Sequence, residues 1–374
     1  MKTATTLLLF SVLGLLVLGI VILVSASTGQ PQARYLIMQP IWAFIGLAAC
    51  AVAAWFDYRW FKRLWWILLL VTIGLLCLVW APNFGVKANG ARRWVNILGF
   101  GFQPSEIAKI ALIVALAWYG ERYQRFMDTF WRGLVVPALG IGVLLALIFK
   151  EPDVGTTVLL AAVSGLMLVI AGLKVSYVVA PGLLCLAGLI AFIAQDQVRS
   201  ERIYAWLHPE ETKLEKGMQA WQSMAAFGNG GINGVGLGEG RQKLGFVPEH
   251  HTDFIFAVIG EELGLVATVG VLLAFVVILG CGAYIAWNAA DTFGMLMASG
   301  ITLLIALQVI INVGVVTGAL PNKGLALPFI SYGGSNLVVM LASVGLLISI
   351  GRHAGAGELV PVSDADELPV PQTS

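Results

Sequence analysis

The sequence predicts an all-α, polytopic integral membrane protein with about ten transmembrane helices and one large extracytoplasmic loop. Hydrophobic residues make up 59% of the 374 residues and charged residues only 11%. The mean hydropathy of +0.88 lies far outside the range of soluble globular chains. A helix needs roughly 20 residues to cross about 30 Å of hydrocarbon. Apolar runs of suitable length occur at about 6–25, 36–56, 64–81, 104–119, 134–149, 156–172, 176–195, 254–286, 295–317 and 331–351.

The order of these runs predicts the topology. The first run could be mistaken for a signal peptide, but its apolar core is too long and nine further spans follow, so we expect a retained helix. An even number of spans places both termini on one side. That side is cytoplasmic by the positive-inside rule, because the short loops 57–63 and 120–133 are rich in basic residues. Residues 1–352 then form the transmembrane domain, and 353–374 form a disordered cytoplasmic tail.

The extracytoplasmic loop covers about 196–252 and has two parts. Residues 199–216 are strongly charged and are typical of an amphipathic surface helix. Residues 228–240, GNGGINGVGLGEG, are rich in glycine. A nucleotide-binding loop is disfavoured here, because no strand precedes the run and no Gly-Lys-Ser/Thr ends it. We expect instead a backbone that turns tightly or approaches a ligand closely.

Charge and cysteine content exclude several classes of function. The net charge is +1, and no clustered basic domain indicates a nucleic-acid partner. The four cysteines lie singly in apolar runs, which predicts neither a disulfide framework nor a metal site. Basic residues do recur on the predicted outer face, against the usual bias. This pattern indicates either a site for an anionic substrate or ordinary solvated loops.

Asp253 is the candidate around which the chain is organised. It lies where a histidine-bearing loop runs into the apolar run 254–286. A carboxylate at the start of a membrane helix is costly to desolvate, so it is near water, paired, or used in chemistry. The adjacent His250 and His251 could suggest a metal site, but neighbouring histidines in a loop are a weak signal.

Glu106 and Lys109 form a second candidate cluster. Pro104 and the polar residues after it suit a helix start, and positions 106 and 109 share one face of that helix. Two opposite charges inside an apolar helix should face a partner or a wet cavity rather than lipid. They either satisfy each other as a structural ion pair or serve a polar site.

Two further boundary segments carry polar groups. Asp153, in Glu151-Pro152-Asp153, either belongs to an acidic patch or caps the helix that follows, and capping is the favoured interpretation. Prolines, paired glycines and hydroxyls over 320–335 predict an interrupted helix, which membranes tolerate only where protein or a cavity satisfies the backbone. A substrate-lining role and a packing role both fit this segment.

Together these motifs resemble the SEDS family, which comprises FtsW, RodA and SpoVE. The resemblance runs in order from the first span to Arg352, and within the family it is closer to the division members than to the elongation members. Two residues depart from the family pattern, Met218 after Gly217 and Asn336 after Ser335. The motifs that carry the resemblance are Ala91-Arg92-Arg93-Trp94, Gln103-Pro104-Ser105-Glu106, Glu151-Pro152-Asp153, Pro248-Glu249-His250-His251-Thr252-Asp253-Phe254, Gly260-Glu261-Glu262-Leu263-Gly264 and Pro328-Phe329-Ile330-Ser331-Tyr332-Gly333-Gly334-Ser335.

The resemblance implies a peptidoglycan glycosyltransferase of the bacterial cytoplasmic membrane that acts in cell division and cell-wall synthesis. It implies lipid II and the growing glycan strand as substrates, with the active site facing outward. The implied partners are a class B penicillin-binding protein, acting as transpeptidase, and other membrane proteins of the divisome or elongasome. Two other functions remain open: a lipid II flippase, or a non-enzymatic scaffold for the transpeptidase.

The resemblance also implies roles for individual residues. Asp253 would be the catalytic base, with Lys109 and Glu106 positioned beside it. Candidates for binding substrate are Arg92, Arg93, Asp153, His251, Thr252, Lys323 and Ser331. A divalent cation, Mg or Mn, would offset pyrophosphate charge, although the sequence shows no closed ligand set. No organic cofactor is expected.

Overall fold

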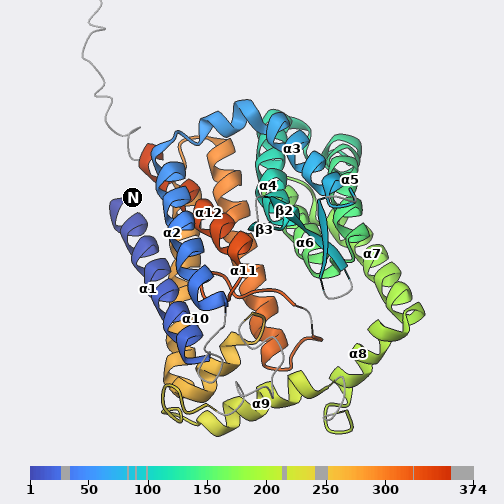
Figure 1. Ribbon diagram of the computed structural model, residues 1–374. Helices are drawn as coiled ribbons and strands as arrows, with labels where there is room; N and C mark the ends of the chain where they lie inside the picture. Colours follow the sequence, from blue (N-terminus) through green and yellow to red (C-terminus); the bar gives the residue numbers. More distant parts are fainter. Residues whose placement is uncertain are drawn as a thin grey trace, which may run out of the picture.

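The computed structural model describes residues 1–26, 34–81, 84–88, 91–97, 100–212, 217–240, 252–322 and 324–354. Each predicted span corresponds to a helix, which confirms the all-α fold class (Figure 1). These helices are α1 (Lys2–Ala26), α2 (Arg34–Trp55), α3 (Arg59–Leu78), α4 (Pro104–Arg122), α5 (Val136–Lys150), α6 (Val154–Ile170), α7 (Val175–Gln195), α10 (Ile255–Trp287), α11 (Thr292–Val316) and α12 (Gly334–Ala354).

Within the described residues, eight of these helices are long and apolar enough to cross a membrane, α5 being counted together with the helical turn before it as the 21-residue stretch Phe130–Lys150. The other two are α6, which is apolar but has only 17 residues, and α4, which carries Glu106 and Lys109. A chain with this many spanning helices is a multi-pass membrane protein. Helix α4 has buried residues along most of its length, so surrounding helices shield its charged groups from lipid.

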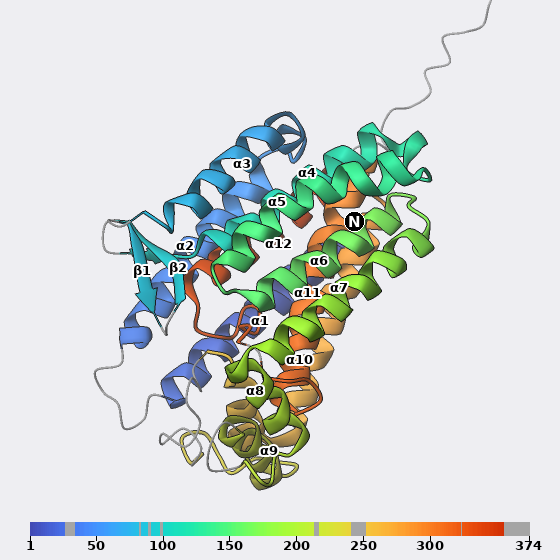
Figure 2. The same ribbon diagram turned by 90° about the vertical axis from the view of Figure 1, so that its right-hand side faces the viewer.

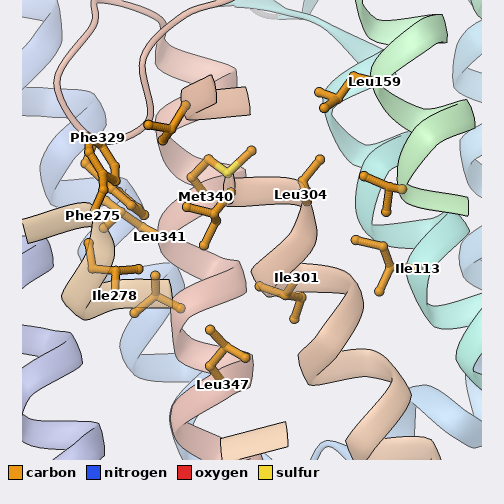
Figure 3. Packing of buried hydrophobic residues seen from close by; sticks show 14 of the residues in the cluster. Ile113, Leu159, Phe275, Ile278, Ile301, Leu304, Phe329, Met340, Leu341 and Leu347 are labelled. Carbon is orange, nitrogen blue, oxygen red and sulfur yellow. The ribbon is translucent and has the colours of Figure 1, made fainter. Parts of the chain in front are cut away.

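The core lies among α10, α11 and α12, with α1 and α4 packed around them. Figure 3 shows Ile301 and Leu304 of α11 between Met340 and Leu347 of α12 on one side and Ile113 of α4 on the other. The aromatic rings of Phe275 and Phe329 stack with centroids 6.5 Å apart. By contrast, none of the 21 residues of α7 is buried. Figure 1 shows this helix diverging from the bundle toward α8.

The predicted loop 196–252 contains more helix than its composition indicates. Helix α8 covers Gln197–Leu207 and turns follow at 209–212, so the described part of 199–216 is helical only as far as Leu207. A second helix, α9, covers Met218–Gly230 and includes the start of the glycine-rich run. In both views α8 and α9 lie beyond one end of the bundle (Figures 1 and 2).

A small antiparallel sheet precedes α4, and the hydropathy pattern does not reveal it. Its strands are β1 (Gly85–Ala88), β2 (Ala91–Ile97) and β3 (Phe100–Phe102), with β2 in the centre. Val95 of β2 pairs with Gly85 of β1 on one side and with Phe102 of β3 on the other. Arg93 of β2 donates to the carbonyls of Glu151 and Pro152, so the sheet lies against the turn between α5 and α6.

Helix α10 is broken at Gly264, and the glycine-rich run supplies the hydrogen bonds that the break removes. Gly264 has φ +74°, a left-handed conformation that ends regular helical hydrogen bonding. On one side of the break, the N–H groups of Val235 and Gly236 donate to the carbonyls of Glu261 and Glu262. On the other, the N–H groups at 265 and 266 donate to the carbonyls at 231 and 232. The tight turn expected for the glycine-rich run is confirmed, and the backbone of this turn lies close to helix α10.

Gly264→Ala is expected to lower the free energy of unfolding by about 2 kcal/mol or more. Left-handed backbone costs an L-residue roughly 1–2 kcal/mol, and a Cβ at this position would also collide with main-chain atoms of Ile232, Asn233 and Gly234. The measurement is thermal unfolding in detergent. Gly270→Ala in the same helix is the control, because a Cβ there meets no atom within 4 Å. Equal melting temperatures for the two variants would contradict the prediction.

Candidate active site

Asp253 lies in the turn that leads into α10. Its side chain is half-buried, and the next residue, Phe254, is only 1% exposed and anchors the turn in the core. The side-chain amide of Asn312 on α11 donates to the main-chain carbonyl of Asp253 at 2.9 Å. The Asp253 carboxylate lies against Gly324, where a Cβ would collide with Oδ2. The carboxylate is therefore placed between the start of α10 and the segment that follows α11.

Glu106 and Lys109 form a buried ion pair on α4, as their spacing predicts. Lys109 Nζ lies 2.8 Å from both carboxylate oxygens of Glu106. Lys109 is 1% exposed and Glu106 is 6% exposed, so the pair is shielded from solvent and lipid. Lys109 also donates to Oε1 of Gln308 on α11 at 3.4 Å. The pair thus satisfies itself and also joins a polar network between α4 and α11.

That network includes Asn336, one of the two departures from the family pattern. Gln308 Nε2 donates to Oδ1 of Asn336 at 3.2 Å and to the carbonyl of Ala326 at 2.8 Å. A buried amide needs partners, and Gln308 provides one here. Gln308 and Asn312 lie one helical turn apart on α11, so a single face of this helix serves both the ion pair and the Asp253 turn.

Asp153 caps helix α6, which confirms the favoured interpretation of that segment. Its carboxylate accepts hydrogen bonds from the main-chain N–H of Thr156 at 3.2 Å and from the Thr156 hydroxyl at 2.9 Å. Gln103, just before α4, donates to the same carboxylate at 3.1 Å. Asp153 is only 5% exposed. In this structure it therefore connects α4 to α6.

The two arginines of β2 differ in their surroundings. Arg93 donates to the carbonyls of Glu151 and Pro152 at 3.1 and 2.6 Å, and so holds the turn between α5 and α6. Arg92 has an exposed side chain. Guanidinium groups suit phosphate oxygens because they donate two parallel hydrogen bonds. The side chain of Arg92 is therefore more accessible than that of Arg93 to a phosphate group.

The predicted interruption of 320–335 is confirmed for the described residues up to 333, which are not helical, and α12 begins at Gly334. The Ser331 hydroxyl accepts from the N–H of Leu327 at 2.8 Å, and the Ser331 carbonyl accepts from Gln39 at 3.3 Å. Ser335 accepts from the N–H of Gln103 at 3.1 Å. These hydroxyls satisfy the main chain of the interrupted segment and the start of α4.

Some predicted residues are not placed by the structure. His251 and Lys323 lie outside the described residues, as does the tail from 355 onward. Thr252 is described and half-buried. Conversely, the site contains two residues not singled out from the sequence, Gln308 and Asn312. In the sequence they stand out as two polar amide residues, four positions apart, within the apolar run 295–317.

Glu151, in the turn between α5 and α6, is a buried carboxyl group with a raised pKa. It is 0% exposed, and neither carboxylate oxygen accepts a hydrogen bond from the described residues. Burial, followed by the negative charge of Asp153, raises the pKa of Glu151 from 4.5 to about 8, and Arg93 opposes this effect. The side chain is therefore mainly neutral at pH 7.

Glu151→Gln is expected to make the protein less sensitive to alkaline pH. The folded state binds the Glu151 proton more tightly than the unfolded chain, so its loss destabilises the fold increasingly from pH ~5 to ~8. At 1.36 kcal/mol per pKa unit, the penalty above this range is on the order of 3–5 kcal/mol. Thermal unfolding at pH 6 and 9 should show the smaller decrease for the glutamine variant. Glu239→Gln, at an exposed carboxylate, is the control and should behave as wild type. Equal pH dependence of the melting temperature in all three proteins would contradict the raised pKa of Glu151.

The fold and this cluster define a multi-pass membrane protein with a carboxylate site where the starts of α4, α6, α10 and α12 meet the end of α11. Residues 3–355 match the cell cycle protein family of FtsW, RodA and SpoVE, and the chain belongs to that family. The resemblance stated from the sequence motifs is thus confirmed.

Relatives and solved structures agree with this assignment. The chain is 42% identical over 341 residues to the probable peptidoglycan glycosyltransferase FtsW of Geobacter metallireducens, covering 90% of this chain and 91% of that protein. It is 40% identical over 362 residues to the stage V sporulation protein E of Bacillus subtilis, covering 94% and 98%. A chain in a peptidoglycan synthase complex that coordinates polymerization and crosslinking matches with a TM-score of 0.78 at 27% identity, covering 93% and 97%. The rod shape determining protein RodA of Thermus thermophilus matches with a TM-score of 0.68 at 27% identity, covering 93% and 96%.

Proposed function

We propose that this protein is a peptidoglycan glycosyltransferase that polymerises lipid II into glycan strands, with Asp253 as the general base. The observation that carries the proposal is the placement of the Asp253 carboxylate. It is half-buried, lies against Gly324, and belongs to a turn that Asn312 fixes. The names of the relatives at 40–42% identity support the reaction class.

The proposed reaction is a single displacement at the donor sugar. Asp253 accepts the proton of the acceptor's 4-hydroxyl as that oxygen bonds to the anomeric carbon of the donor. The bond from that carbon to the pyrophosphate oxygen breaks on the opposite face, and the lipid pyrophosphate leaves with the electron pair. Attack from the opposite face inverts the configuration, from an α-linked donor to a β-linked polymer.

Charged residues on β2, on α4 and before α6 would serve the leaving group and the architecture of the proposed site. Arg92, with its exposed side chain, is the proposed contact for the pyrophosphate. Arg93 and Asp153 hold the turn before α6 and connect it to α4. Lys109, paired with Glu106 and bonded to Gln308, adds a fixed positive charge on the side of the site formed by α4 and α11. His251, Thr252, Lys323 and Ser331 remain proposed substrate contacts.

A divalent cation, Mg or Mn, is proposed only to offset pyrophosphate charge. Among the described residues, no group of three or more His, Cys, Asp and Glu side chains could hold a metal ion. The described residues therefore do not fit a closed protein site, and no step of the proposed reaction passes through a metal. An organic cofactor has no place in this reaction.

The proposal also concerns location and partners. The site would face outward from the bacterial cytoplasmic membrane, with both termini in the cytoplasm, because lipid II is polymerised outside the cell. The match to a chain of a peptidoglycan synthase complex supports assembly with a crosslinking enzyme. We propose that this partner is a class B penicillin-binding protein, alongside other divisome or elongasome membrane proteins.

The test is glycan polymerisation from lipid II in detergent by the purified protein together with a class B penicillin-binding protein. Long glycans are expected, and no second leaflet is required. Absence of polymer, combined with lipid II transport between leaflets of reconstituted vesicles, would replace the proposal with a flippase. Absence of both activities, with stimulation of the transpeptidase, would indicate a scaffold.

A further inference from the structure

Asn312 connects two segments of the site that are far apart in the sequence. It lies near the end of α11 and is 1% exposed. Its Nδ2 atom donates to the carbonyl of Asp253 at 2.9 Å and to the carbonyl of Leu325 at 2.7 Å. An amide nitrogen carries two hydrogens, so both are used. One side chain therefore fixes the turn before α10 to the segment after α11.

Gly324, the residue before Leu325, leaves room for the Asp253 carboxylate. A Cβ at Gly324 would collide with Oδ2 of Asp253, so a larger residue at 324 would push the carboxylate out of its present position. Residues 324–325 are thus linked to Asp253 in two ways, one direct and one through Asn312. The Asp253 carboxylate lies against Gly324. The carbonyls of Leu325 and Asp253 both accept hydrogen bonds from the side-chain amide of Asn312.

The same face of α11 stiffens the segment next to these contacts. Gln308, one turn before Asn312, donates to the carbonyl of Ala326. The carbonyls of Leu325 and Ala326 therefore accept hydrogen bonds from the side chains of Asn312 and Gln308, which lie on one face of α11. Oδ1 of Asn312 is buried and accepts no hydrogen bond from the described residues. Among these residues, the Asn312 amide therefore acts only through the two hydrogen bonds that it donates.

We propose that Asn312 is a positioning residue for the Asp253 carboxylate, acting together with Gly324. This inference rests on the proposed function, because it assumes that Asp253 accepts the proton. A base must lie within hydrogen-bonding reach of that proton, and a displacement of about 1 Å can lower a rate by about 100-fold. Asn312 fixes the main chain that carries the carboxylate, and Gly324 provides the space into which the carboxylate points.

The test compares kcat and KM for lipid II polymerisation by the complex with the class B partner, per folded molecule. Asn312→Leu removes both donors at similar volume and is expected to lower kcat by about 10- to 100-fold, with KM changed less than about threefold. Gly324→Ala should lower kcat similarly, because it displaces the carboxylate while the two hydrogen bonds donated by Asn312 stay in place. Gly333→Ala is the control, since its nearest neighbour would be the Asn336 Cβ at 3.8 Å.

The double variant distinguishes positioning from general stability. If both residues act through one carboxylate, combining Asn312→Leu with Gly324→Ala should lower kcat no further than the stronger single change. Multiplied losses, or a kcat within twofold of wild type in either single variant, would overturn the proposal. If Asn312→Leu does not fold, Gly324→Ala alone decides by the same kcat criterion. Full activity of Asp253→Asn in the same assay would instead refute the proposed function.

Discussion

Asp253→Asn is expected to lower the rate of glycan polymerisation by about 10²- to 10⁴-fold, the usual contribution of a positioned general base. Asparagine has nearly the same shape, so it should fit the space at Gly324, and its main-chain carbonyl should still accept from Asn312. Folding and partner binding should therefore be retained. The measurement is the initial rate of polymerisation from lipid II at matched amounts of folded complex.

Asp196, a carboxylate outside the proposed site, is the matched control for this change. Asp196 caps α8 by accepting from the N–H of Arg199 at 3.1 Å, and asparagine caps helices about as well as aspartate. Asp196→Asn should therefore polymerise at the wild-type rate. A full polymerisation rate in Asp253→Asn, with normal folding, would exclude Asp253 as the base.

Local rules predicted the parts of this structure that depend on neighbours in sequence. The spans followed from hydropathy, because every backbone polar group in lipid must be satisfied within a helix. The pairing of Glu106 with Lys109 followed from their shared helix face. The capping role of Asp153 followed from its place before α6, and the structure shows the expected bond to Thr156.

The remaining features depend on tertiary contacts that local rules do not contain. The glycine-rich run indicated a tight turn, but its partner, the broken part of α10, is set by the fold. Arg93 was typical of a phosphate ligand, yet it donates to two main-chain carbonyls of a distant turn. Asn312 was visible as a polar residue in an apolar run, but its link to Asp253 spans 59 residues.

Lys109→Met is expected to destabilise the protein by about 3–5 kcal/mol, because it leaves the Glu106 carboxylate buried without its partner. Glu106 is 6% exposed, and both of its carboxylate oxygens bond to Lys109. The melting temperature in detergent should fall substantially, and polymerisation should be lost. This single change cannot separate a structural ion pair from a functional charge, so a second variant is required.

The double variant Lys109→Met with Glu106→Gln separates the two roles. It removes both charges, so no uncompensated charge remains buried, and replacing a buried pair by neutral groups is often close to neutral for stability. The melting temperature should recover most of its loss. Polymerisation should remain low, because the proposed site uses the positive charge of Lys109 beside Gln308. If the double variant folds and polymerises at the wild-type rate, the pair is structural only, and the catalytic contribution of this cluster is confined to Asp253.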